Sequence, residues 1–155
     1  MHAAGRDDPE PKALACYGLW LPEPARTLLR FVGGRPVSAA TCAFLAWAAG
    51  QLAAEGVRVL VLILIWDNAP WHVSREVSAW IRAHNRRAKR DGSCRLLVCR
   101  LPSKSPWLNP IEPRWAHGKR AIAEPERKLT GGELKRRLCD HYRCPLLPPL
   151  AQQAA

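Results

Sequence analysis

Acidic residues are scarce in this sequence. Only 13 Asp and Glu stand against 24 Lys and Arg, so the 155-residue chain carries a formal net charge of +11 at pH 7. A charge of this size favours an anionic partner, with nucleic acid ahead of an acidic membrane surface. A ribosomal-type or merely soluble basic protein is the alternative. Charge alone carries no information about the fold.

Long hydrophobic runs and a secretory signal are also lacking. The longest apolar run, residues 59–66, has about half the length of a membrane-spanning helix, so no membrane span is expected. The first twelve residues, MHAAGRDDPEPK, are polar, which favours a reducing cytoplasm. Apolar residues make up 48% of the chain, which argues against disorder throughout. The length suits one domain, or a piece of one.

The six cysteines lack the close spacing of most structural zinc sites. Cys94 and Cys99 form one pair, and Cys139 and Cys144, with His141 between them, form another. Each pair is separated by four residues, whereas the usual zinc knuckle has two. Because an odd separation places strand residues on opposite faces, Cys94 and Cys99 should point apart. We expect ordinary buried thiols, with a zinc-stabilised basic module as the alternative.

The order of apolar segments predicts a mixed α/β layer architecture without internal repeats. The expected strands are 13–21, 25–34, 57–66 and 94–102, the first two forming an antiparallel edge pair and the others lying parallel. The expected helices are 38–56, 74–90, one starting at Asn109, and 130–142. The segment VRVLVLILIW (57–66) shows no polar alternation after Arg58, which predicts a strand buried on both faces.

Helix-capping residues support these boundaries. Ser38 and Ser74 precede helical patterns as expected N-caps, and Thr130 and Glu133 have the capping-box spacing. Pro110 would lie in the first turn of the helix that starts at Asn109, where its missing N–H costs nothing. The tail, residues 143–155, is expected to be disordered or loosely packed.

Two carboxylates occupy positions that suit a catalytic or metal-binding site. Asp67 directly follows the most apolar predicted strand, and ligands bind at the carboxyl ends of strands in open α/β sheets. Glu112 lies in the first turn of a predicted helix, where the helix dipole tolerates negative charge. Prolines and tryptophans surround it and would position it rigidly: Pro106, Trp107, Pro110, Pro113 and Trp115. Two such oxygen ligands in a basic protein suit Mg²⁺ bound near phosphate. The alternatives are a solvated or capping Asp67 and a Glu112 that merely opposes the dipole.

The stretches WDNAPWHVS (66–74) and LPSKSPWLNPIEPRW (101–115) together resemble the catalytic core of DDE transposases of bacterial insertion sequences, relatives of the Tc/mariner group. The resemblance runs from about residue 12 to about residue 142. It implies a ribonuclease-H-like mixed sheet with flanking helices, DNA cleavage and strand transfer, and Mg²⁺ as cofactor with Mn²⁺ as a substitute. It also implies transposon-end and target DNA as partners, dimers or higher assemblies, and a place in the bacterial cytoplasm, at the nucleoid when bound.

Carried over residue by residue, the resemblance assigns Asp67 and Glu112 as metal ligands and catalytic residues. Supporting roles, either orienting ligands or touching DNA, fall to Asn68, His72 and Asn109. The alternative for Asn68 and His72 is that they cap the helix near Ser74. The expected phosphate contacts are Lys104, Arg114, Lys119, Arg120, Arg86, Arg87, Lys89 and Arg90. The last four could instead interact only with the helix C-terminal dipole.

The sequence departs from the family in one essential residue. The family has a first aspartate on the first, central strand, upstream of 13–21, and nothing suitable is present here. Asp7 and Asp8 lie in GRDDPEP, which resembles the linker after that strand, so we interpret 1–12 as linker and 13–142 as a truncated catalytic domain. A helix-turn-helix region is missing too. We therefore expect little activity and aggregation-prone strand edges, unless an upstream polypeptide supplies the strand. A non-enzymatic nucleic-acid-binding remnant is the alternative.

Overall fold

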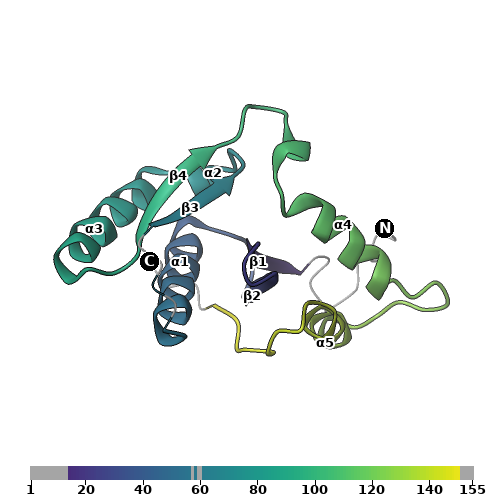
Figure 1. Cartoon of the computed structure of the whole chain (residues 1–155). Coiled ribbons are helices and arrows are strands. Elements are labelled where there is room, and N and C mark those ends of the chain that lie inside the picture. The colour runs from purple at the N-terminus through teal and green to yellow at the C-terminus, as the bar shows by residue number, and fades with distance from the viewer. Residues whose placement is uncertain (1–13, 57, 59–60, 151–155) are drawn as a thin grey trace.

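The computed structural model describes residues 14–56, 58 and 61–150 (Figure 1). Its strands are β1 (Ala15–Leu21), β2 (Arg26–Val32), β3 (Val61–Trp66) and β4 (Arg95–Arg100). Its helices are α1 (Ser38–Ala54), α2 (Pro70–Val73), α3 (Arg75–Asp91), α4 (Glu112–Ile122) and α5 (Gly131–Tyr142), with a short 3₁₀ helix, η1 (Pro106–Leu108). The predicted order of strands and long helices is confirmed, whereas α2 and η1 were not predicted.

The strands form two separate two-stranded sheets within the described part of the chain. β1 and β2 pair antiparallel, with Gly18 opposite Leu29, and β3 and β4 pair parallel, with Leu64 opposite Val98. Both strand directions agree with the sequence expectation. The expectation was a mixed sheet that lacks its central strand, and within the described residues no strand joins β1 to β3 by hydrogen bonds. This arrangement of small sheets with flanking helices is consistent with a ribonuclease-H-like domain.

The β3–β4 sheet is covered on one face only. Leu64 and Trp66 of β3 and Leu96 of β4 pack in one cluster with residues of α1 and with Val77 and Ile81 of α3. Side chains of the opposite face are exposed, namely Val61 (41%), Ile63 (58%), Ile65 (44%) and Leu97 (57%). The prediction that this strand is buried on both faces is therefore wrong. Its residues are apolar on both faces, but the described helices pack against only one of them.

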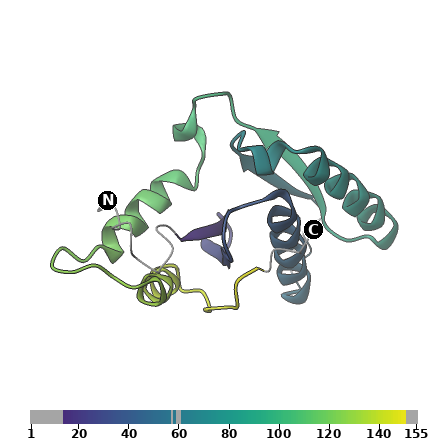
Figure 2. The ribbon, with the colours of Figure 1, turned by 180° about the vertical axis from the view of Figure 1, so that it is seen from behind.

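The β1–β2 sheet lies between helices on both faces. On one face Leu28 packs with Ala48 and Leu52 of α1. On the other, Leu29 and Phe31 pack with side chains of α4 and α5. The two views show α1 and the α4–α5 pair on opposite sides of these strands (Figures 1 and 2). This sheet therefore forms the centre of the molecule and anchors α4.

Local capping residues account for two helix starts. The Ser74 side chain accepts a hydrogen bond from the Val77 amide at 3.2 Å, so the expected cap of α3 is confirmed. Thr130 and Glu133 form both bonds of the capping box of α5, as predicted. Each bond satisfies an amide that the first helical turn leaves without a partner.

Two other helix starts differ from the prediction. α1 begins at Ser38 itself, and Val37 is its N-cap without a side-chain bond. α4 begins at Glu112 rather than Asn109, so Pro113 rather than Pro110 lies in its first turn. The preceding residues turn instead through η1, whose end is closed by the Asn109 amide bonding to the Pro106 carbonyl at 3.0 Å.

The chain after α5 returns to the β1–β2 sheet. The amide of buried Leu150 donates to the Phe31 carbonyl at 2.8 Å, and Leu150 forms a parallel bridge with Val32. The prediction that residues 143–155 are disordered is therefore wrong at Leu150, which is bonded to the sheet. Asp7, Asp8, residues 151–155 and residues 57, 59 and 60 of the strand expected at 57–66 lie outside the described residues. No helix that the structure describes is long and apolar enough to cross a membrane.

Candidate active site

A cavity of about 490 Å³ lies between β1, the carboxyl end of β3 and α4. Five residues expected at a functional site line it together: Asp67, His72, Asn109, Glu112 and Lys119. Apolar side chains of β1 and β3 complete its wall. The two carboxylates thus come from separate elements and meet at one cavity, which we call the carboxylate cavity.

Asp67 is the first residue after β3, and its side chain is 53% exposed. One carboxylate oxygen, Oδ1, accepts a hydrogen bond from the Ala69 amide at 3.1 Å and lies 2.7 Å from His72 Nδ1. The other oxygen has no hydrogen-bond partner among the described residues. Asp67 is therefore held in orientation through one oxygen, and the second can bind a ligand.

His72 is fixed by aromatic packing. Its ring is parallel to that of Trp66, with centroids 4.8 Å apart and an interplanar angle of 3°. Tyr17 of β1 packs near the same imidazole, with ring centroids 6.2 Å apart. Only 17% of the His72 side chain is exposed. Sequence reasoning missed Trp66 and Tyr17, although an aromatic residue directly before a strand-end carboxylate was an available signal.

Neither Asn68 nor His72 caps α3, so the capping alternative is wrong for these two residues. Ser74 provides that cap. Asn68 Nδ2 instead donates to the Leu101 carbonyl at 2.8 Å and so links the loop after β3 to the end of β4. Asn68 does not line the carboxylate cavity. Its observed role is to position the loop that carries Asp67.

Glu112 is exposed and is the first residue of α4. Its amide donates to the Asn109 carbonyl at 3.1 Å. Asn109 is buried, and its side-chain oxygen accepts from the Ile111 amide at 3.4 Å. Asn109 therefore stabilises the turn into α4, which places Glu112 at the cavity.

The helix that carries Glu112 is anchored on β1. Trp115, one turn after Glu112, packs so closely on Gly18 that a methyl group at Gly18 would collide with the indole ring. Only glycine leaves room for this contact. The position of Glu112 relative to Asp67 thus depends on the packing of α4 against β1.

The expected phosphate contacts fall into four groups. Lys119 lines the carboxylate cavity, whereas Lys104 and Arg120 are exposed outside it. Arg114 lines a different cavity, between β1, β2, α4 and α5. The remaining four expected contacts are carried by α3, which lies on the opposite side of the molecule from α4 (Figures 1 and 2): Arg86, Arg87, Lys89 and Arg90. Lys89 and Arg90 occupy the last turn of α3, where they also suit the helix dipole.

The donor chemistry fits Mg²⁺. This ion prefers oxygen ligands and commonly takes only one or two protein carboxylates, leaving positions for water and phosphate. Asp67 and Glu112 bring two carboxylates of this kind to one cavity. Among the described residues there is no group of three or more His, Cys, Asp or Glu side chains placed to hold a metal. This part of the chain therefore offers the cavity two carboxylates, Asp67 and Glu112, that could hold a metal ion.

The cysteines give no support to a zinc site. Cys139 is packed in an apolar cluster with Cys16 and Cys144 at its edge. Burial raises the pKa of Cys16 to about 11 and that of Cys144 to about 12, which favours the neutral thiol. Zinc binds the thiolate. Cys99 is exposed on β4, and all six cysteines are free.

The structure defines a mixed α/β domain that brings two carboxylates, Asp67 and Glu112, to one cavity. The model of one protein family, the DDE superfamily endonucleases, matches residues 44–135. The match covers more than half of the chain and includes both carboxylates, so the chain belongs to this family. Members are generally dependent on divalent metal ions and act on DNA, which supports a transposase- or nuclease-like function. No curated protein matches the chain.

Proposed function

We propose that this chain carries two catalytic carboxylates of a bacterial insertion-sequence transposase of the Tc/mariner-related type, which cleaves DNA strands and transfers the freed 3′ ends. The observation that carries the proposal is the meeting of Asp67 and Glu112 at one cavity, with Lys119 on its wall. A cationic side chain beside two carboxylates suits a phosphodiester, because it can bind phosphate while the carboxylates bind metal. The protein would act in the bacterial cytoplasm, at the nucleoid.

Asp67 and Glu112 would hold Mg²⁺, or Mn²⁺ in its place. The bound ion would neutralise phosphate charge and increase the nucleophilicity of water or of a 3′-hydroxyl. His72 keeps the Asp67 carboxylate in orientation through its 2.7 Å contact, and Asn109 supports the turn before Glu112. Lys119 would bind a phosphate oxygen.

We further propose that a strand from outside the described residues, such as one supplied by an upstream polypeptide, fills the gap between β1 and β3 and brings a third carboxylate. Each of these strands has one edge without a strand partner in the described chain, and both contribute to the wall of the carboxylate cavity. Unpaired strand edges accept an added strand readily. Until it is added, two carboxylates would bind metal weakly and the chain would be nearly inactive.

Metal binding tests the site directly. We expect the wild-type chain to bind Mn²⁺ weakly by electron paramagnetic resonance, and Asp67→Asn or Glu112→Gln to remove that binding. Asp91→Asn and Glu126→Gln are matched controls, because both residues are exposed and neither lines the carboxylate cavity. Retention of Mn²⁺ binding by both site variants would contradict the proposal.

Plasmid nicking tests the third carboxylate. With Mg²⁺ or Mn²⁺, the isolated chain should nick supercoiled DNA at close to the background rate. Co-expression with the polypeptide encoded upstream should increase nicking, and Asp67→Asn should abolish the increase. Nicking by the isolated chain as fast as by an intact transposase of this type would show that no third carboxylate is needed.

A second candidate function is nucleic-acid binding without cleavage. It is favoured by the net charge of +11 and by the lack of a three-residue metal group in the described chain. In that case Mn²⁺ binding would be absent. Duplex binding would weaken with salt, and Asp67→Asn and Glu112→Gln would leave it unchanged.

A further inference from the structure

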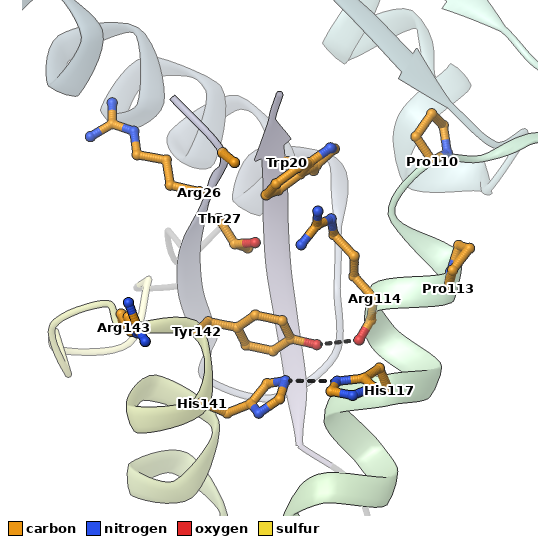
Figure 3. Close-up of a pocket in the computed structure, with 11 residues that line it drawn as sticks. Trp20, Arg26, Thr27, Pro110, Pro113, Arg114, His117, His141, Tyr142 and Arg143 are labelled. Carbon is orange, nitrogen blue, oxygen red and sulfur yellow. Dashed lines mark hydrogen bonds between the residues drawn. The ribbon is translucent and has the colours of Figure 1, made fainter. Parts of the chain in front are cut away.

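A second cavity, of about 630 Å³, lies between β1, β2, α4 and α5 (Figure 3). We call it the α4–α5 cavity. The residues most relevant to binding on its wall are Trp20, Arg114, His117, His141, Tyr142 and Arg143. Within the described part of the chain, no carboxylate side chain lines it. Because successive residues of a helix point about 100° apart, α4 can present Glu112 to one cavity and Arg114 to the other.

Arg114 is oriented as a hydrogen-bond donor. Its guanidinium lies over the Trp20 ring, 3.0 Å from the centroid. Stacking uses the flat face of a guanidinium and leaves its in-plane N–H groups available. Those groups have no hydrogen-bond or ion-pair partner within the part of the chain that the structure describes. The backbone of Arg114 is also held, since the Tyr142 hydroxyl donates to its carbonyl at 2.7 Å.

Further donors come from α5 and from the facing side of α4. His117 Nδ1 and His141 Nε2 lie 3.4 Å apart (Figure 3), which leaves one nitrogen of each ring available. Arg143 follows α5 directly in the left-handed conformation (φ 53°) and is exposed. Arg26 differs from these residues, because its guanidinium is paired with Glu55. The described wall of the cavity thus carries several N–H donors and no carboxylate that would pair with them, which suits an anion.

We propose that the α4–α5 cavity binds one nucleotide of an unpaired DNA strand, with its phosphate on Arg114, His117 and Arg143. This inference rests on the proposed function and adds a strand-binding site to it. A volume of about 630 Å³ lies within the usual range for small-ligand sites, about 300–1,000 Å³. Trp20, Tyr142 and two prolines add apolar wall against which a base can stack. The phosphates of intact duplex lie on a convex surface and would not fill such a cavity.

Binding to a fluorescein-labelled ten-nucleotide thymidine strand, measured by anisotropy in EDTA, tests this site without any metal. Arg114→Gln should weaken binding about tenfold, the usual cost of a lost charge-assisted contact. Arg136→Gln is the matched control, because Arg136 is exposed on α5 outside the cavity and the charge change is the same. It should weaken binding less than about twofold. Arg114→Gln and Arg136→Gln should weaken binding to duplex DNA by the same factor.

Photochemical crosslinking gives a readout that does not require a variant. The same strand carrying 5-iodouracil should form an adduct with wild-type protein at Trp20 or Tyr142, located by mass spectrometry. Adducts only elsewhere, or equal single-strand binding by the Arg114 and Arg136 variants, would overturn the inference. Wild-type protein that binds duplex but not single strand overturns it and leaves the proposed function standing. Wild-type protein that binds neither form of DNA overturns both.

Discussion

Replacing Gly118 by alanine should destabilise the protein, although alanine is the better helix former. Gly118 is buried in the middle of α4. A methyl group there would collide with the Tyr142 hydroxyl and lie 2.9 Å from the adjoining ring carbon, Cζ. The ring must therefore move, and its hydrogen bond to the Arg114 carbonyl would be lost.

The expected change in the free energy of unfolding is the sum of two losses and one gain. Overpacking of this kind costs about 1–3 kcal/mol, and loss of one hydrogen bond about 1 kcal/mol. The gain in helix propensity from glycine to alanine is about 1 kcal/mol. Gly118→Ala should therefore lower the free energy of unfolding by about 1–3 kcal/mol. At about 2–4 °C per kcal/mol for a chain of this size, the Tm should fall by roughly 2–12 °C.

Gly50→Ala is the matched control. Gly50 lies in α1, is exposed, and has no heavy atom within 4 Å of the position that a Cβ would occupy. The same substitution should stabilise the protein there by about 0.5–1 kcal/mol. Thermal unfolding followed by circular dichroism measures both variants. If Gly118→Ala raises the Tm as Gly50→Ala does, the contact between α4 and Tyr142 is not as described.

Two further predictions concern titratable groups. The Arg127 side chain and the Thr130 amide hold the pKa of Glu133 at about 2, below its ordinary 4.5, so its stabilising effect is present above pH 4.5 and lost as the pH falls towards 2. The urea midpoint of Glu133→Gln should thus lie below wild type at pH 7 and converge with it near pH 2; a constant difference would exclude this ion pair as the cause. Among the thiols, exposed Cys99 should react with a maleimide at pH 8 well before Cys16 and Cys144, whose pKa values burial raises to about 11 and about 12. Cys99→Ser should remove the fast phase in peptide mapping, and equally fast labelling of Cys144 would contradict its burial.

The sequence alone predicted correctly those features that depend only on residues close together in the chain. The Ser74 cap of α3 and the capping box of α5 were predicted and are present, because each forms within three residues of chain. The start of α4 was misplaced by three residues. The turn before it is closed by Asn109 together with η1, and a proline pattern does not distinguish this turn from a first helical turn.

Burial could not be inferred from the composition of β3. Ile63 and Ile65 are as apolar as a residue of a fully covered strand, yet they are exposed. Whether a strand face is covered depends on helices that are distant in sequence, and here α1 and α3 both pack on the same face.

The sequence by itself determined the order of elements, the family and the two carboxylates, because these depend on short motifs and local periodicity. Only the tertiary structure decided that Asp67 and Glu112 share a cavity, since this requires α4 to pack on β1 through Trp115 and Gly18. It also decided that Arg114, an expected phosphate contact, lies over Trp20 in another cavity. Residues two positions apart on a helix face different neighbours, and the neighbours come from distant parts of the chain.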